Sequence, residues 1–558
     1  MKILVIQSCE HERFSEEVAW ARARWPDAVI VTLVDRAHEA ALRTGRESGE
    51  VFLYGVRDDG GWDLSDETRR RLREHRFDLC VMSFNDRMGV QFWQSRMVPI
   101  QARIPGIVVI NNRGRRRSYR RWSWSVSTVI ACLVLRLVQP VARFVRNVLD
   151  VGMIAALTLL ALLGAALKAA GLHPLGRAGE RRGEQPLRLF IFIPSFGLGG
   201  AQTVLIDFLR QIDRRKCTVT VCTLVQRDKF FESTARQAGF APVYLDCAPG
   251  YPPYWPIIWA LARRLARERP DAAIGWLPWA TAFTVLAASL AGVPRVLQSL
   301  HSESPPRRSL TLPVWQRPLE MITARMADRV IACSDASRTD YIAWGWIPPR
   351  KIVTVRNGID PERIQRPSEA ELRAVRASLQ AEGRPLVGIV GRLSFEKDHR
   401  TFLDAMRLVH EAVPSVAAVV IGTGHEQSRL KKESERLGLA RVVTFLGARA
   451  DVGALMASLD VLVLSSRSEG LPIVLLEGQA LGVPVVTTDA GGARETVRDG
   501  ETGFVVPCGD SGQLASRIVQ LLGDERLRRS LGEKARAYVL NGFHADRMAA
   551  EILRLCDA

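Results

Sequence analysis

The sequence lacks the cysteine spacings that build disulfide frameworks or zinc sites. Its nine cysteines are scattered over 558 residues, and no two of them form a Cys-x-x-Cys pair. An odd count without framework spacing predicts reduced thiols and a cytosolic setting. The first residues, MKILVIQSCEHERF, contain too short an apolar run for a signal peptide, so we interpret them as a first strand.

The sequence also lacks the motifs of nucleic-acid-binding proteins. Its net charge of +18 is compatible with nucleic acid, anionic membranes or phosphorylated substrates as partners. It contains no zinc-finger spacing and no aromatic-basic signature of an RNA-binding sheet, so we expect no nucleic-acid partner. No Asp-x-Asp pair is present to hold Mg²⁺, and we expect neither a metal nor a cofactor.

The stretch from 460 to 492 has the pattern of a β-loop-α-β unit. A short apolar run at 461–464 predicts a buried strand, and a polar loop, SSRSEG, follows it. Pro472 then opens an apolar helical segment, which Gly482 closes before a second strand at 483–488. In open α/β sheets, ligands bind at loops that follow the carboxyl ends of parallel strands, so this loop is a candidate ligand site.

Two glutamates lie in this unit, in different surroundings. Glu469 is in the loop beside Gly470, where backbone N–H groups can reach a ligand, whereas Glu477 is in the apolar helix. An isolated glutamate is usually a solvated helix position. The residues around Glu477 leave no polar face, so we expect it to need a partner such as a ligand hydroxyl. These neighbours are Ile473, Val474, Leu475, Leu476, Ala480 and Leu481.

A second candidate site begins in residues 187–212, where a strand runs into the Gly-rich turn FGLGGAQ and then a helix. Gly199 and Gly200 allow close approach of the backbone, and the helix N-terminus favours an anion. The alternative is a plain tight turn into a helix. His301 follows a later strand of the same region and is either a cleft residue or a structural histidine. We interpret Asn357–Gly358 as a turn without a catalytic role.

A third candidate site is the segment PLVGIVGRLSFEKDH, residues 385–399. A strand reaches Gly391, and Arg392 and Lys397 then lie five residues apart around a turn. Two cations between a strand end and a helix suit a diphosphate, with arginine as a bidentate fork and lysine as a point charge. The alternative is a pair of surface cations.

Four segments of the sequence, taken in their order along the chain, resemble the motifs of retaining GT-B glycosyltransferases of family four. The matching segments are FGLGGAQ, GRLSFEKD, EGLPIVLLE and TTDAGGARETV, and the resemblance covers about residues 187–558. It implies an α/β architecture of two Rossmann-like lobes, the GT-B fold. Gln202 departs from the pattern, because an acidic residue is common there, and the acceptor side matches no subgroup.

The resemblance also implies roles for individual residues. Glu469 would lie beside the donor sugar, Glu477 would bind the nucleotide ribose, and His301 would contact the sugar. Arg392 and Lys397 would neutralise the leaving diphosphate, and Gly447 and Arg449 would hold the base through backbone groups. The glycine turns and the segment after Glu469 complete the expected donor site: Gly199, Gly200, Gly391, Gly470 and Leu471.

The function that follows is metal-independent transfer of a sugar from a UDP or GDP sugar to an acceptor with retention of configuration. A glycan or a lipid-linked glycan is the expected acceptor. The alternatives are a GT-B epimerase or phosphorylase, or a non-catalytic scaffold that binds nucleotide sugars.

The expected domains follow the composition of the chain. Residues 187–363 form the first lobe, 364–542 the second lobe, and 543–558 a C-terminal helix that crosses back. Residues 1–112 alternate strand and helix patterns, loosely resemble half of a heptosyltransferase, and form an accessory or acceptor-recognition domain. Residues 113–186 are a linker. In the first domain His11, Asn85 and Asp86 are either a site or loop polar residues.

The linker has a basic and an apolar part. Arg113–Arg121 holds six arginines in nine residues, and residues 122–172 are strongly apolar. We expect this region to bind an anionic membrane, with 123–145 and 148–170 as a helical hairpin whose ends are both cytosolic. Arg136 weakens the first span, which is alternatively re-entrant or interfacial, and a buried core helix is a further alternative. The expected location is the cytoplasmic side of the plasma (inner) membrane.

Overall fold

The structure is a computed structural model that describes most of the chain from residue 185 onward. The described residues are 185–195, 199–224, 232–245, 255–301, 316–343, 345 and 347–557, with seven strands and isolated positions between residues 2 and 166. The chain divides into two units, Met1–Val148 and Leu149–Ala558, each of which is described by itself.

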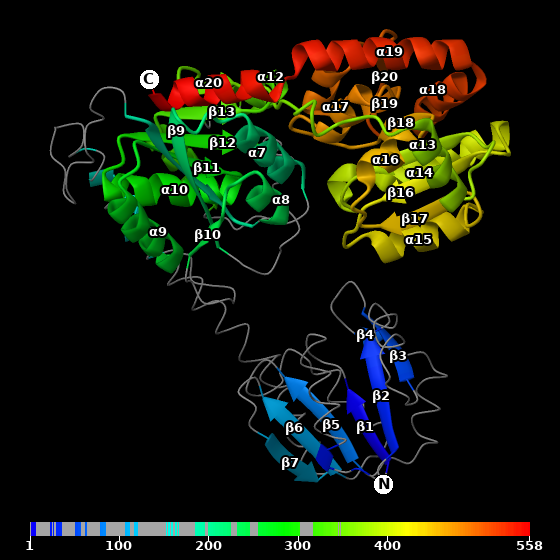
Figure 1. Cartoon of the computed structure of the whole chain (residues 1–558), viewed down its shortest axis with the longest axis horizontal. Helices are drawn as coiled ribbons and strands as arrows, with labels where there is room; N and C mark the ends of the chain where they lie inside the picture. Colours follow the sequence, from blue (N-terminus) through cyan, green and yellow to red (C-terminus); the bar gives the residue numbers. More distant parts are fainter. Residues whose placement is uncertain are drawn as a thin grey trace. The chain divides into compact units, whose positions relative to one another are not determined.

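The first unit contains a seven-stranded sheet (Figure 1). Its strands are β1 Lys2–Ile6, β2 Val29–Asp35, β3 Val51–Val56, β4 Trp62–Asp63, β5 Leu79–Phe84, β6 Gly106–Asn111 and β7 Arg116–Arg120. The order is β4-β3-β2-β1-β5-β6-β7, with parallel pairing from β3 to β6 and antiparallel edges. The strand patterns predicted in residues 1–112 correspond to β1, β2, β3, β5 and β6 of this sheet. His11, Asn85 and Asp86 lie outside the described residues.

Strand β7 corrects the interpretation of the arginine cluster as a linker. Arg116–Arg120 pairs antiparallel with β6, with Val108 opposite Ser118, so the sheet continues past the expected boundary at residue 112. The physical reason is that an edge strand needs only one partner and tolerates charged residues, which discourage pairing with a further strand. A dense run of charge therefore does not exclude a strand at a sheet edge.

The second unit begins with a seven-stranded parallel sheet, the first lobe. Its strands are β8 Leu187–Ile193, β9 Cys217–Thr223, β10 Val243–Tyr244, β11 Ala272–Trp276, β12 Arg295–Leu300, β13 Arg329–Ala332 and β14 Ile352–Thr354. Its helices are α7 Gly200–Arg210, α8 Glu232–Gln237, α9 Trp255–Glu268, α10 Pro278–Ala291, α11 Gln316–Met326 and α12 Asp335–Ala343. The order is β10-β9-β8-β11-β12-β13-β14, which is doubly wound around β8.

A second lobe repeats this design. Its strands are β15 Leu386–Val390, β16 Ala417–Ile421, β17 Val443–Gly447, β18 Val461–Leu464, β19 Val485–Thr488 and β20 Gly503–Val506, in the order β17-β16-β15-β18-β19-β20. Its helices are α13 Glu369–Ser378, α14 His399–Ala412, α15 Gln427–Arg436, α16 Val452–Ala457, α17 Ile473–Ala480, α18 Ser511–Gly523 and α19 Glu525–Gly542, with short 3-10 turns η4 Phe395–Lys397 and η5 Gly491–Thr496.

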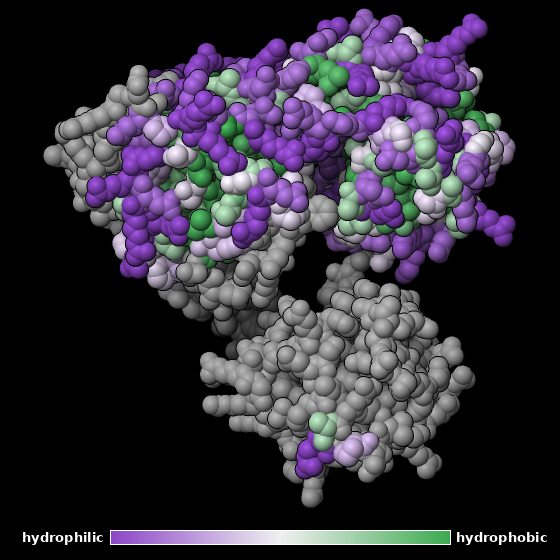
Figure 2. All heavy atoms as spheres, in the orientation of Figure 1, coloured by the Kyte–Doolittle hydropathy of each residue, from purple (hydrophilic) through white to green (hydrophobic). Residues whose placement is uncertain are grey.

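The central strands of both lobes are buried on both faces. In β8, Leu189 and Ile191 pack into one apolar cluster, and Phe190 and Phe192 pack into the cluster on the opposite face. This pattern is typical of a parallel strand covered by helices on both sides. On the face shown in Figure 2, the coloured surface of the two lobes is mostly hydrophilic, with small hydrophobic patches over each lobe.

The last helix, α20 Ala545–Asp557, leaves the second lobe and packs on α7, β11 and β12 of the first. Figure 1 shows α19 over the second lobe and α20 over the first. A backbone bridge between Ile359 and His544 begins this return, and Arg295 Nε donates to the Leu555 carbonyl at 3.0 Å. A Cβ at Gly358 would overlap the backbone of His544, so glycine permits this close approach.

Within the described residues, none of the helices combines the length and the apolar character needed to cross a membrane. The predicted spans 123–145 and 148–170 lie outside the described residues, apart from isolated helical positions between 152 and 166. Three leucines among these positions are exposed: Leu159 by 68%, Leu162 by 41% and Leu163 by 56%.

Candidate active site

The loop between β18 and α17 carries Glu469, and its neighbours fix the position of the loop. Pro472 stands immediately before α17, where its missing N–H costs no helical hydrogen bond. A Cβ at Gly478 would overlap the Leu462 side chain, so this glycine lets α17 pack closely on β18. The Gly492 amide donates to the Glu469 carbonyl at 3.1 Å, which braces the loop from the turn after β19.

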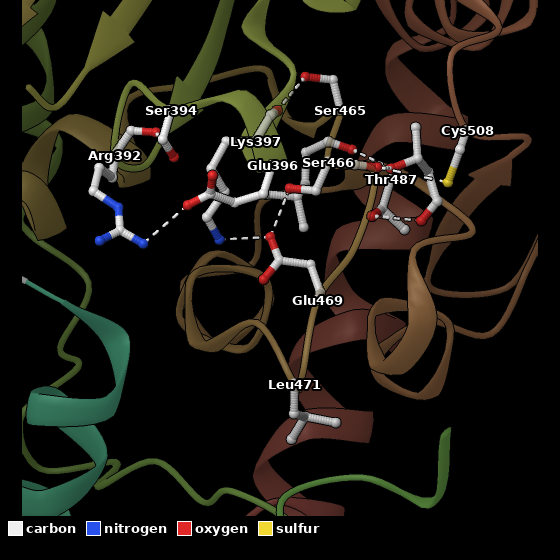
Figure 3. A network of polar contacts seen from close by, with 12 residues as sticks. Arg392, Ser394, Glu396, Lys397, Ser465, Ser466, Glu469, Leu471, Thr487 and Cys508 are labelled. Carbon is white, nitrogen blue, oxygen red and sulfur yellow. Dashed lines mark hydrogen bonds and ion pairs between the residues drawn. The ribbon is translucent and has the colours of Figure 1, made fainter. Parts of the chain in front are cut away.

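Glu469 is buried and has two hydrogen-bond donors. Its Oε1 accepts from Lys397 Nζ and from Ser466 Oγ, each at 2.6 Å, and Figure 3 shows both side chains pointing at the carboxylate. Lys397 ends the turn after β15, and β15 pairs with β18, so adjacent strand ends bring the two charges together. The structure therefore joins two predicted residues that lie 72 positions apart.

Arg392, the other predicted cation, has a different environment. It pairs with Glu396 at 3.0 Å, away from Glu469, and its side chain is 67% exposed (Figure 3). The adjacent Gly391 lies where β15 ends, and Gly422 passes so closely that a Cβ there would overlap the Gly391 carbonyl. A ligand group at this edge would therefore meet backbone as well as the guanidinium.

Of the two residues predicted to hold the base, Gly447 is the last residue of β17 and Arg449 follows this strand. Gly447 has φ +70°, a conformation that favours glycine, and its carbonyl accepts from the Gly422 amide at 2.8 Å. Arg449 pairs with Asp451 at 2.6 Å, which raises the pKa of its guanidinium. Gly447 and Gly391 thus lie near the carboxyl ends of strands on either side of β16.

Glu477 has a protein partner that the sequence did not reveal. Its Oε1 accepts from Arg363 Nη2 at 2.7 Å, and Arg363 also binds Asp207 of α7 through two hydrogen bonds of 2.8 and 2.9 Å. The expectation that Glu477 needs a partner is met within the chain, and the predicted ribose contact stays a prediction. Arg363 lies 156 residues from Asp207, so spacing alone gives no signal of this contact.

His301 lies at the end of β12 in the first lobe. Its ring stacks on Trp276 with centroids 4.4 Å apart, and Nε2 is 2.8 Å from Ser299 Oγ. Burial lowers the pKa of His301 to about 4, and the nearby Asn357 side chain acts in the opposite direction. The imidazole is therefore neutral near pH 7 and suits hydrogen bonding rather than charge stabilisation.

Asn357, interpreted as part of a turn without a catalytic role, makes a contact between the lobes that the sequence did not reveal. Asn357 is buried, and its side-chain amide donates to the Leu471 carbonyl at 3.2 Å. This bond crosses between the lobes and reaches the loop that carries Glu469. A second missed residue, Glu495, accepts from the amides of Asp335 and Ala336 at 3.1 and 2.7 Å, so it caps α12 across the same interface.

The two predicted glycines of the first lobe lie at the start of α7. Gly199 precedes the helix in extended conformation, no side chain caps α7, and its first turn contains no acidic residue. A Cβ at Gly200 would lie 3.9 Å from that of Ile473, the first residue of α17. The N-termini of two helices, one from each lobe, are therefore adjacent, and both favour an anion.

Comparisons with known proteins cover both lobes. The family model described as Glycosyltransferase Family 4 matches residues 198–363, and the model described as Glycosyl transferases group 1 matches residues 373–538. A GDP-mannose-dependent alpha-(1-6)-phosphatidylinositol monomannoside mannosyltransferase of Mycobacterium tuberculosis is 30% identical over 367 residues, which are 63% of this chain and 93% of the relative.

Two further proteins illustrate the range of relatives. A UDP-Gal:alpha-D-GlcNAc-diphosphoundecaprenol alpha-1,3-galactosyltransferase of Escherichia coli is 27% identical over 267 residues, which are 46% of this chain and 68% of the relative. The crystal structure of Anabaena Alr3699/HepE in complex with UDP-glucose is 25% identical with a TM-score of 0.60, covering 66% of this chain and 99% of that one.

Proposed function

Because the chain belongs to glycosyltransferase family 4 and is a GT-B glycosyltransferase that uses nucleotide sugars, we propose that it is a retaining, metal-independent enzyme. The donor is a UDP or GDP sugar, and the acceptor is a glycan or a lipid-linked glycan. The observation that carries this proposal is the partly buried contact of 2.6 Å between Lys397 and Glu469, in the loops that follow two adjacent strands. A cation and a carboxylate so placed can serve a departing diphosphate and a sugar at the same time.

In the proposed reaction, the bond between the anomeric carbon and the diphosphate oxygen breaks first. Negative charge grows on the leaving diphosphate, and Lys397, Arg392 and the start of α7 stabilise it. An acceptor hydroxyl attacks the anomeric carbon from the face that the diphosphate leaves, and its proton passes to a diphosphate oxygen. The products are the glycoside, with retained configuration, and the nucleoside diphosphate.

Glu469 and His301 position the sugar in this scheme. The carboxylate accepts hydrogen bonds from sugar hydroxyls and stabilises the positive character of the anomeric carbon. The neutral imidazole of His301, held by Trp276 and Ser299, contacts the sugar from the first lobe. Metal independence follows from assigning the diphosphate charge to side chains and helix N-termini.

The donor assignment is tested by titrating the full chain with UDP sugars and GDP sugars in a calorimeter. We expect micromolar binding of one class, unchanged by EDTA. NMR of donor hydrolysis should show that the sugar released at the earliest times has the same anomeric configuration as the donor. An inverted product would overturn retention, sugar inversion without transfer would indicate an epimerase, and absence of nucleotide-sugar binding would indicate a different protein class.

We further propose that the chain acts at the cytoplasmic face of the plasma membrane. Support comes from the exposed Leu159, Leu162 and Leu163, from Arg113–Arg121, and from relatives whose names specify lipid acceptors. Exposed leucines bury in the bilayer interface while arginines bind anionic headgroups. Flotation with vesicles containing 30% anionic lipid should carry the chain, and a chain lacking residues 122–172 that floats equally well would overturn this proposal.

We propose acceptor recognition as the role of the N-terminal domain, predicted over residues 1–112. A doubly wound sheet offers a second ligand site separate from that of the lobes. Deleting the domain should raise the KM of the acceptor and leave the hydrolysis of the donor unchanged. Equal loss of both activities would argue instead for a structural role.

A further inference from the structure

Arg363 connects three separate parts of the enzyme. It lies between β14 and α13, in the segment that joins the lobes, and binds Asp207 of the first lobe and Glu477 of the second. Asp207 is fully buried, and the side chains of Glu477 and Arg363 are 14% and 25% exposed. This cluster is therefore shielded from solvent at the junction of the lobes.

The chemistry of this cluster requires an arginine. Nε and Nη2 of Arg363 face the two oxygens of Asp207, and Nη2 also reaches Glu477. Burial raises the pKa of Asp207, and the hydrogen bond and charge of Arg363 act in the opposite direction. One planar fork can hold both carboxylates, whereas a lysine ammonium cannot hold them with the same geometry.

The two tethered helices are those that begin at the donor site. Asp207 belongs to α7 and Glu477 to α17, and the first residues of these helices, Gly200 and Ile473, are adjacent. Neither helix has a side-chain cap or an acidic residue in its first turn. The Arg363 contacts thus connect the two helices at positions that follow their N-termini, the ends that we expect to face the diphosphate.

We propose that Arg363 is a positioning residue of the donor site. Asp207 of the first lobe fixes the guanidinium of Arg363, and Arg363 in turn holds the Glu477 carboxylate in the orientation that accepts the ribose hydroxyls. Recognition of the ribose in the second lobe then depends on a buried carboxylate of the first. This inference rests on the proposed use of a nucleotide-sugar donor and on the predicted contact between Glu477 and the ribose of that donor.

A structural role and a positioning role predict different binding data. If the cluster only stabilises the fold, its loss weakens every nucleotide sugar by the same factor. If it positions Glu477, its loss removes the preference for a donor that has both ribose hydroxyls. A hydrogen bond from a hydroxyl to a carboxylate changes affinity on the order of tenfold or more, which is measurable.

The experiment measures Kd of the full chain by calorimetry for UDP-glucose and GDP-mannose, using the donor that the wild type binds more tightly. The same donor is then tested as its 2′-deoxy and 3′-deoxy analogues. The variants are Arg363→Lys, Asp207→Asn and Glu477→Gln, with Arg366→Lys as matched control. Arg366 lies in the same segment between β14 and α13, but it donates to the Leu481 carbonyl and is partly exposed.

We expect the wild type and Arg366→Lys to bind the ribose donor at least tenfold more tightly than one of the deoxy analogues. Glu477→Gln and Arg363→Lys should reduce this ratio to about twofold or less, with a smaller reduction for Asp207→Asn. Melting temperatures measured without donor identify variants that fail to fold. If Arg363→Lys fails to fold, Asp207→Asn provides the test, because asparagine has the same shape as aspartate.

Two outcomes separate the inference from the proposed function. If Glu477→Gln loses the ratio and folded Arg363→Lys and Asp207→Asn keep it, the positioning role is wrong while the ribose assignment stands. If the wild type binds the ribose donor and both deoxy analogues with the same Kd, the assignment of Glu477 to the ribose is itself wrong. Arg363 then has no ribose-binding carboxylate to position. Equal weakening of all three donors in Arg363→Lys would show a structural role only.

Discussion

The two lobes of the second unit share the order of their first six strands and differ in how they face the candidate donor site. The first lobe presents the backbone of a Gly-rich turn, Gly199 and Gly200, and a helix start without charged side chains. The second presents Lys397 and Glu469 on adjacent strand ends. For the diphosphate of the proposed donor, we therefore expect backbone groups from the first lobe and charged side chains from the second.

This difference has an energetic consequence for the protein without a ligand. Buried charges need partners, and Lys397 and Glu469 supply them to each other with help from Ser466. The helix start of the first lobe needs no such compensation, because water can satisfy its amides. We therefore expect the second lobe to be far more sensitive to single substitutions at the site than the first.

The largest effect is expected for Lys397→Ala. It removes the charge assigned to the diphosphate and leaves Glu469 buried without its cation. Loss of one such group costs about 2.7–4 kcal/mol of transition-state stabilisation, or roughly 10²–10³ in kcat. Donor hydrolysis and transfer measure it, and Lys431→Ala on the exposed face of α15 is the control. Retention of more than a tenth of wild-type kcat would contradict the assignment.

A backbone substitution tests whether the side chains of the second lobe depend on precise loop positions. At Gly492 a Cβ would overlap the Gly470 carbonyl and lie 2.8 Å from Ser334 Cβ, so Gly492→Ala must displace the Glu469 loop. A displacement of about 1 Å can cost on the order of 100-fold in rate. Gly453→Ala in α16, with no neighbouring atoms, is the control, and equal kcat for the two variants would exclude this dependence.

One property should be alike in the two lobes, because each buries a histidine. Burial lowers the pKa of His301 in the first lobe and of His399 in the second, each to about 4, and the charge of Lys397 adds to the effect at His399. Unfolded histidine titrates near 6.5, so the unfolded chain binds more protons between pH 6.5 and 4. The contribution of the two neutral histidines to the free energy of unfolding is therefore fully present above pH 6.5. It falls as the pH drops through this window, by on the order of 1.4 kcal/mol per pH unit for each residue.

Urea unfolding at pH 7 and pH 5 measures this loss. His399→Leu should reduce the difference by about 2 kcal/mol, because the ring it replaces has no hydrogen-bond partner among the described residues and must be protonated on unfolding. The same loss of stability in wild type and His399→Leu would show that other groups cause the acid sensitivity.

Much of this architecture could be predicted from local patterns. The apolar runs gave the central strands of all three sheets, and the segment 460–492 gave the β18–α17–β19 unit with Glu469 in its loop. These features depend on neighbours in sequence, where periodicity and Gly or Pro positions carry the information. Strand β7 was missed because its arginine-rich sequence is typical of a solvated linker, and sequence alone does not reveal that the segment pairs at a sheet edge.

The contacts between the lobes could not be predicted in this way. Arg363 meets Asp207, and Asn357 meets Leu471, across more than 100 residues of sequence. Such pairs form only when two folded lobes dock, and either residue alone resembles a surface arginine or a turn asparagine. Glu477 gave the one useful signal, since a carboxylate on an apolar helix requires a partner without specifying which.

The smallest effect is expected in the first lobe, where Gly200→Asp tests recognition by the helix start. A carboxylate in the first turn of α7 interacts favourably with the free amides and repels an anionic donor. A charge at this position is worth about 0.3–1 kcal/mol, so Kd for the donor should rise roughly two- to fivefold relative to Gly200→Asn, which has the same shape without the charge. Calorimetry at low salt measures the ratio, and 0.5 M NaCl should reduce it through screening. If Asp and Asn have the same effect, α7 contributes shape alone, and the contrast between the lobes is one of geometry and not of charge.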